Sequence, residues 1–161
     1  TVTGVQTCAL PISAVSPRRG WGENLEVAYR IVAAGSTEDV GIFDDMADKV
    51  DRILAGASWR EVLGGRKVRS FAANIERPEA AGPVTIDRHA VSILAGRPLT
   101  DAEASDVLER IGGYQVAAGI YRTVARRAGL LPQQLQAISW CEWRHIHERA
   151  ERFDRADLAA F

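Results

Sequence analysis

Apolar side chains recur at helical spacing along almost the whole of this 161-residue chain. From Gly22 onward they fall three and four positions apart, and glycine or proline separates one such segment from the next. The sequence contains no convincing run of alternating apolar and polar residues, which is the pattern of a half-buried strand. We therefore expect an all-α protein, a bundle of seven or eight helices.

The same spacing predicts where individual helices lie. The first helix is expected to bury an apolar stripe and to end at Gly35 in a left-handed conformation. The residues of this stripe are Leu25, Ala28, Tyr29 and Val32. Further helices are expected over residues 43–54, 58–62, 66–75, 87–95, 101–111 and 114–128, and a long one is expected from residue 132 onward.

The composition is that of one ordinary globular domain. Apolar residues make up 47% of the chain and charged residues 25%, so a chain of this length can bury a core of its own. Its apolar runs are only a few residues long, far short of the roughly 20 residues that span a bilayer. No basic and apolar leader opens the sequence. We therefore expect a cytoplasmic protein that does not bind membranes.

Metal-binding residues are sparse. Cys8 and Cys141 are the two cysteines of the sequence, too few for an iron–sulfur cluster or a structural zinc site. His145 and His147 lie two positions apart and hence on different faces of a helix. We expect no metal, no metal cluster and no cofactor.

The first thirteen residues stand apart from the rest. Their sequence, TVTGVQTCALPIS, resembles translated read-through of a sequencing adapter. We expect residues 1–13 to be foreign and disordered, and the native chain to start at Ala14 after the loss of its true N-terminus. The domain is then expected over residues 14–150, followed by a helical tail over residues 151–161.

The charge distribution leaves room for a nucleic-acid partner. The net charge of −1 argues against indiscriminate DNA binding, because neutralisation of phosphates supplies much of the affinity. Arg66, Lys67 and Arg69 nevertheless lie together, which permits one basic face on a nearly neutral protein. The alternative is an ordinary solvated helix surface.

Two short motifs carry the chemistry. The first is LGGRK at residues 63–67, and the second is VTIDRH at residues 84–89. In order and spacing they resemble the helix-hairpin-helix DNA glycosylases, such as endonuclease III and 8-oxoguanine DNA glycosylase. In that superfamily a glycine-rich hairpin enters a helix that bears a lysine, and a V-D-x-H type segment follows whose aspartate begins the next helix. The segment SPRRGWGENLEVA at residues 16–28 is similar to the superfamily's opening helix.

The resemblance covers roughly residues 14–144, and the chain is also similar to small uncharacterised proteins of actinobacterial phages and their hosts. It implies a glycosylase-like helical bundle, truncated at its N-terminus, in which Lys67 and Asp87 are the catalytic pair. Cleavage of an N-glycosidic bond builds positive charge on the sugar, which a fixed carboxylate such as Asp87 stabilises. A neutral Lys67 could attack the anomeric carbon and, through a Schiff base, permit abasic-site lyase chemistry. Without that attack, Asp87 could activate water instead.

The hairpin and its neighbours are the expected DNA contacts. Gly64 and Gly65 let backbone N–H groups approach a phosphate, and Arg66 and Arg69 lie beside them. His89 follows the aspartate and is the fifth candidate. The hairpin departs from the fuller L-P-G-x-G form of the superfamily, because Leu63 stands in the place of the first glycine. We expect a monomer that binds DNA.

Two other functions fit the same sequence. The chain could be a non-catalytic DNA-binding or partner-binding module that keeps this fold, since Lys67 alone reads as a solvated lysine and Asp87 alone as a helix N-cap. It could also be a phage enzyme of modified-pyrimidine metabolism that acts on nucleotides or hypermodified DNA.

Overall fold

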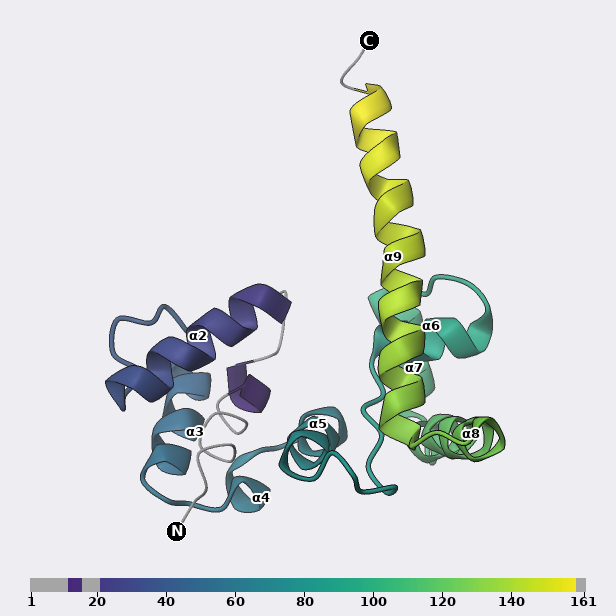
Figure 1. Ribbon diagram of the computed structural model, residues 1–161. Coiled ribbons are helices and arrows are strands. Elements are labelled where there is room, and N and C mark those ends of the chain that lie inside the picture. Colours follow the sequence, from purple (N-terminus) through teal and green to yellow (C-terminus); the bar gives the residue numbers. More distant parts are fainter. Residues whose placement is uncertain (1–11, 16–20, 159–161) are drawn as a thin grey trace. The chain divides into compact units, whose positions relative to one another are not determined.

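The computed structural model describes residues 12–15 and 21–158, and within them every regular element is a helix (Figure 1). This confirms the expected all-α class for the described residues. A helical turn over residues 12–15 comes first. The helices that follow are α2 (Trp21–Ala34), α3 (Asp44–Leu54), α4 (Trp59–Val62), α5 (Arg66–Glu76), α6 (Arg88–Ala95), α7 (Asp101–Glu109), α8 (Gly113–Ala128) and α9 (Pro132–Leu158).

Within the described ranges, none of the helices combines the length and the apolar character needed to cross a membrane.

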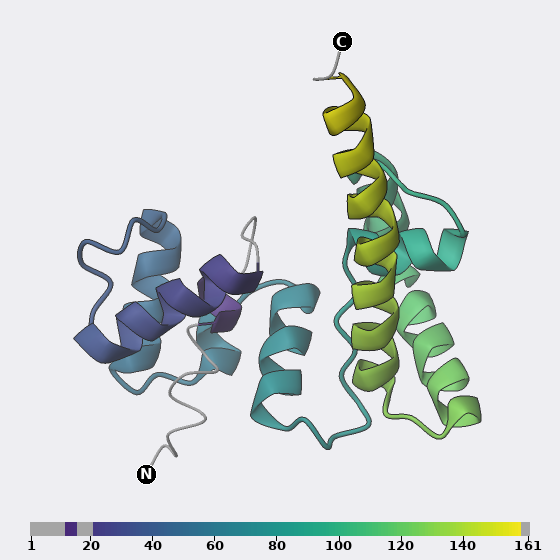
Figure 2. The same cartoon turned by 45° about the horizontal axis from the view of Figure 1, so that its top comes forward.

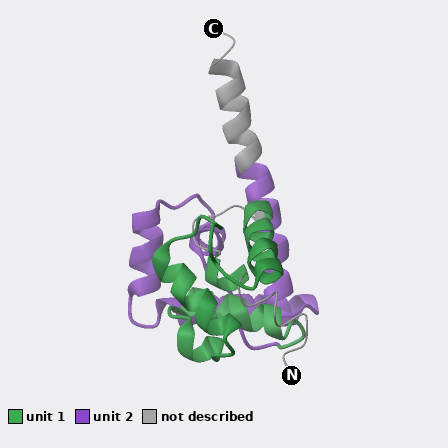
Figure 3. Ribbon diagram, turned by 90° about the vertical axis from the view of Figure 1, so that its left-hand side faces the viewer, with its two compact units in different colours: residues 1–80 green, residues 81–161 purple. Residues whose placement is uncertain are grey.

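Contacts inside the chain divide it into two compact units, residues 1–80 and residues 81–161 (Figure 3). The first unit holds α2 to α5, and the second holds α6 to α9. Each unit has a hydrophobic core of its own. The domain expected over residues 14–150 spans the boundary between them.

The core of the first unit gathers side chains from α2, α3, α4, α5 and the segments between them. Its buried apolar residues are Ala14, Val15, Val27, Ile31, Val40, Val50, Ile53, Trp59, Val62, Leu63 and Ala72. Burial of this apolar surface is the main force that holds these short helices in place, since isolated helices of this length are marginal in water.

The buried face of α2 differs from the predicted stripe. The residues of α2 that lie buried are Asn24, Val27, Ala28 and Ile31. Leu25 is 40% exposed and Tyr29 is 74% exposed, so the predicted stripe is wrong at these two positions. The two sets of residues have the same spacing, so spacing alone does not choose between the two faces. On the observed face the Nδ2 of Asn24 donates to the carbonyl of Ile12 at 3.2 Å.

The helical turn over residues 12–15 belongs to the first unit and begins two residues before Ala14, the expected start of the native chain. Ser13 and Val15 are both 0% exposed. Residues 1–11, with Cys8 among them, make up most of the segment expected to be foreign and lie outside the described residues.

The second unit is a cluster of four helices around a second core (Figure 2). In it α9 packs against α6 and α8, and α7 packs against the same two helices. Its buried apolar residues are Val84, Ile86, Ala90, Val91, Leu99, Ala104, Tyr114, Ala117, Ala118 and Tyr121.

Tyr114 fixes the segment that leads into α6. Its hydroxyl donates to the carbonyl of Val84 at 2.9 Å and accepts from the backbone N–H of Ile86 at 3.2 Å. Val84 and Ile86 are buried, so both backbone groups need a partner inside the protein. One side chain therefore satisfies two backbone groups just before the start of α6.

Candidate functional site

The glycine hairpin lies in the first unit, between α4 and α5. α4 ends at Val62 and α5 begins at Arg66, so Leu63, Gly64 and Gly65 form the connection. Gly65 has φ 70° and ψ 140°, a backbone conformation in which any side chain would be strained. Leu63 is 1% exposed and anchors the turn in the core. The expected meeting of two helices across a glycine turn is confirmed.

Arg69 holds the hairpin together. Its Nε donates to the carbonyl of Leu63 at 2.7 Å, and its Nη2 donates to the carbonyl of Arg60 at 2.9 Å. These acceptors lie at the end of α4, where backbone carbonyls have no partner within the helix. The guanidinium thus has a structural role, and its contact with DNA stays a prediction.

A carboxylate at the end of α5 ties that helix back to α4. Glu76 accepts from the Nε1 of Trp59 at 3.1 Å and from the Nη1 of Arg60 at 3.2 Å. The same guanidinium pairs with the second carboxylate oxygen of Glu76 and lies 4.3 Å from the centre of the Trp59 ring. The hydrogen bond from Arg60, more than any other contact, holds the pKa of Glu76 below its usual range. Glu76 is therefore a neutralised, structural carboxylate.

Lys67, the predicted nucleophile, is the second residue of α5 and is exposed. Gly64, Gly65 and Arg66 are exposed beside it. A lysine attacks carbon only as a neutral amine, which desolvation or a neighbouring cation favours. Because Lys67 is exposed, its desolvation would have to come from a bound partner.

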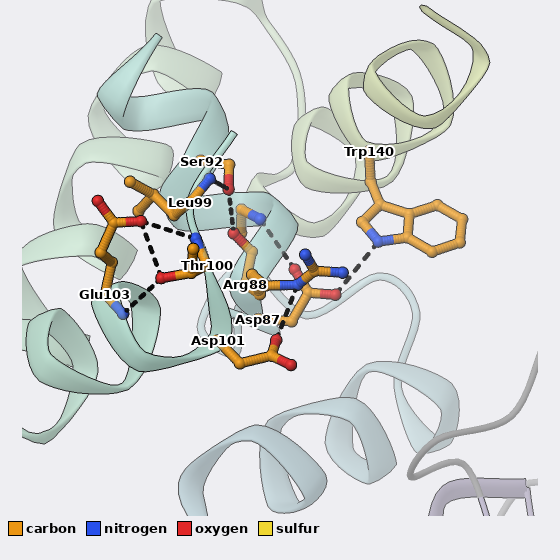
Figure 4. A network of polar contacts seen from close by, with 9 residues as sticks. Asp87, Arg88, Ser92, Leu99, Thr100, Asp101, Glu103 and Trp140 are labelled. Carbon is orange, nitrogen blue, oxygen red and sulfur yellow. Dashed lines mark hydrogen bonds and ion pairs between the residues drawn. The ribbon is translucent and has the colours of Figure 1, made fainter. Parts of the chain in front are cut away.

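Asp87, the predicted carboxylate, lies in the second unit at the N-cap of α6, as expected (Figure 4). Its Oδ1 accepts from the backbone N–H of Ala90 at 2.8 Å. Its Oδ2 accepts from the indole Nε1 of Trp140 on α9 at 3.2 Å. Both oxygens of this half-buried carboxylate are thus held by N–H donors, one from its own helix and one from another.

The carboxylate of Asp87 keeps its charge uncompensated. The nearest arginine in the sequence, Arg88, pairs instead with Asp101 at 3.0 Å. Among the residues that the structure describes, none forms an ion pair with Asp87. Burial raises the pKa of the Tyr121 phenol, a hydrogen bond with Ser139 lowers it, and the negative charge of Asp87 raises it. Asp87, before α6, thus lies near Tyr121 of α8 and Trp140 of α9.

An aromatic and a basic side chain contact Trp140, the indole that donates to Asp87. The ring of His89 meets the ring of Trp140 edge-on, with 6.1 Å between centroids. The guanidinium of Arg144 lies 4.8 Å from the centre of the Trp140 ring. His89 therefore contacts the residue that binds Asp87, and its contact with DNA stays a prediction.

The predicted site residues form two groups, one in each unit. The hairpin group consists of Gly64, Gly65, Arg66, Lys67 and Arg69, and the α6 group consists of Asp87 and His89. The convergence of Lys67 and Asp87 on one cleft would join the two units, and it stays a prediction.

Trp140 was not among the predicted site residues. It lies 53 positions from Asp87, and its spacing on α9 indicates only a helix face. The available signal is chemical, because a partly buried tryptophan uses its indole N–H on an acceptor. Which acceptor it uses depends on tertiary packing.

The fold and the two groups define an all-helical protein with a glycine hairpin in one unit and a helix-capping aspartate in the other. The chain belongs to the family described as "Family of unknown function (DUF7178)", which matches residues 1–147. No curated protein and no solved structure matches the chain.

Proposed function

We propose that this protein cleaves the N-glycosidic bond of a damaged or modified base in DNA. The observation that carries the proposal is the carboxylate of Asp87, which two N–H donors hold in place and no described cation neutralises. Such a group favours the positive charge that develops on the sugar as the base departs. The order of hairpin, lysine and N-cap aspartate, together with the resemblance to helix-hairpin-helix glycosylases, supports the same reaction.

Lys67 is the proposed nucleophile. Its amine attacks the anomeric carbon, the bond to the base breaks, and the base leaves with the electron pair and takes up a proton. Opening of the sugar then gives an imine with Lys67, from which strand cleavage by β-elimination can follow. Bound DNA would cover the exposed Lys67 and supply the desolvation that a neutral amine needs.

The test is incubation of the full chain with duplexes that carry oxidised, alkylated, deaminated or abasic sites, followed by reduction with borohydride. We expect a covalent protein–DNA adduct in the wild type and none in Lys67→Ala. The sequence offers a matched control, because Lys49 is its other lysine and pairs with Asp45 at 3.0 Å on α3. Lys49→Ala should still be trapped. A wild-type chain that cuts no duplex and gives no adduct would exclude the proposed reaction.

A non-catalytic DNA-binding module is the second candidate. It is favoured by the exposure of Lys67, because an amine in water is poorly suited to be a nucleophile. In that case the full chain binds duplex DNA with a salt-dependent affinity that Lys67→Ala and Asp87→Asn leave almost unchanged, and no duplex is cut.

A further inference from the structure

The geometry points to Trp140 as the residue that positions the carboxylate of Asp87, with Arg144 holding Trp140 in turn; as a statement about catalysis, this rests on the proposed function. The indole N–H of Trp140 on α9 points at Oδ2 of Asp87 (Figure 4). Trp140 belongs to neither the hairpin nor the aspartate motif.

A single N-cap hydrogen bond fixes only one of the two carboxylate oxygens of an aspartate. The backbone N–H of Ala90 fixes Oδ1 at 2.8 Å, as in many helix N-caps. The second bond, at 3.2 Å from Trp140, fixes Oδ2 and with it the plane of the carboxylate. Two donors from different helices therefore define the direction in which the free lone pairs of Asp87 point, which is what electrostatic stabilisation of a developing charge requires.

The indole is itself held on two sides. The guanidinium of Arg144 lies over its face at 4.8 Å, and the ring of His89 meets it edge-on. A cation over the face of an indole is an attractive interaction that also draws electron density from the ring. Arg144 thus fixes the position of Trp140 and favours donation by its N–H group.

Trp143 provides the natural contrast. It lies three residues further along α9, and its ring is tilted against that of His147, with 4.2 Å between centroids. Replacement of Trp143 by phenylalanine therefore makes the same chemical change on the same helix without removing a donor from Asp87.

The first measurement is NMR of the full chain, and it requires no activity. In Asp87→Asn, the indole N–H signal of Trp140 should shift, whereas the signal of Trp143 should stay in place. In Trp140→Phe, the Ala90 amide should exchange with solvent about threefold to tenfold faster, because the carboxylate that it binds is less fixed. Trp143→Phe should leave that amide unchanged. Equal behaviour of the two tryptophan variants, or a Trp140 signal that ignores Asp87→Asn, would overturn the inference.

The second measurement separates positioning from folding. In a chain that cuts DNA, Trp140→Phe should lower kcat by about tenfold to a hundredfold, since a misplaced catalytic group costs rate rather than affinity. The Kd for the duplex should stay the same, and Trp143→Phe should keep the wild-type kcat. Equal kcat values in the two variants would overturn the positioning role. Absence of cleavage by the wild type would instead count against the proposed function, and the NMR result would still decide whether Trp140 fixes Asp87.

Discussion

Each unit of the molecule contains a tryptophan whose indole donates to a carboxylate, but the two pairs differ in charge. In the first unit, Trp59 donates to Glu76, and Arg60 occupies both oxygens of that carboxylate. In the second unit, Trp140 donates to Asp87, and no described residue forms an ion pair with it. The indole–carboxylate bond of the first unit thus ties α5 to α4, whereas that of the second unit leaves Asp87 without an ion-pair partner among the described residues.

Burial follows the same division. The ring of Trp59 is 6% exposed and belongs to the core, whereas Trp140 is only half-buried. A neutralised carboxylate next to a buried ring contributes to stability, and an uncompensated carboxylate next to an accessible ring can act on a ligand. We therefore expect Glu76 to contribute to stability and Asp87 to act on a ligand.

The largest effect is expected for Trp59→Ala. Removal of this core side chain should lower the free energy of unfolding by about 3–5 kcal/mol, because it leaves a cavity and removes a donor from Glu76. Trp140→Ala should cost only about 1–2 kcal/mol, since part of its surface is already in water. Urea unfolding followed by far-UV circular dichroism measures both. Equal losses would remove the proposed difference between the two rings.

Asp87→Asn is expected to have the next largest effect. Loss of the charge should lower the rate of base excision in single-turnover assays by about a hundredfold to a thousandfold, as for other groups that stabilise a developing charge. Glu76→Gln, the equivalent change in the first unit, should keep the wild-type rate. If Glu76→Gln slowed cleavage as much as Asp87→Asn, the distinction between a structural and a functional carboxylate would fail.

The pH dependence of stability gives a third test. The pKa of Glu76 is lowered in the folded protein, first by its hydrogen bond from Arg60, so the folded state binds the proton more weakly than the unfolded state. Its contribution is complete above the ordinary pKa of a glutamate and is lost as the pH falls through the lower, folded value. At neutral pH Glu76→Gln should cost about 1.5 kcal/mol. Its urea midpoint should also fall less steeply than that of the wild type between neutral and acidic pH, and parallel curves would contradict this.

The second unit has its own acid-sensitive group. The hydrogen bond from Arg97, followed by that from the backbone of Thr100, lowers the pKa of Glu103 to about 2. Because this pKa is lowered, the stability that Glu103 supplies is present above pH 4.5, its ordinary value, and is lost as the pH falls toward 2. Thermal unfolding of Glu103→Gln should therefore show a smaller loss of Tm across this window than the wild type shows.

The smallest effect concerns helix starts. Thr100 accepts from the backbone N–H of Glu103 and completes a capping box at α7, so Thr100→Ala should cost about 1 kcal/mol. Ser58 occupies the N-cap of α4 but makes no side-chain cap bond there. Ser58→Ala should therefore leave the urea midpoint unchanged. If Ser58→Ala lowered the free energy of unfolding as much as Thr100→Ala, the side-chain cap bond of Thr100 would not be the cause of its larger effect.

Local signals in the sequence predicted much of the fold. Helix ends depend on single residues with special backbone properties, and the structure places them as expected. The left-handed glycines that follow α2, α6 and α8 are Gly35, Gly96 and Gly129, and Pro132 begins α9. Asp87 was predictable as an N-cap for the same reason, because a cap is formed within four residues.

Contacts between distant segments were not predictable in this way. The inward face of α2 was predicted wrongly at Leu25 and Tyr29, because two faces of this helix share the same apolar spacing and packing against other segments chooses between them. The partner of Asp87 lies 53 positions away on α9, and neither motif points to it. Arg69 was expected to bind DNA and is found on two carbonyls of its own hairpin, a role that charge patterning does not distinguish from a free cation.

The hydroxyl of Tyr114 has a consequence for how the second unit tolerates change. The phenol donates to the carbonyl of Val84 and accepts from the N–H of Ile86, as a neighbouring β-strand would. The described residues contain no strand that could do this. The ring of Tyr114 on α8 thus fixes where the backbone enters α6, and with it the position of the first side chains of that helix. Insertions or deletions in the surrounding loops can therefore change the loop length without moving the start of α6.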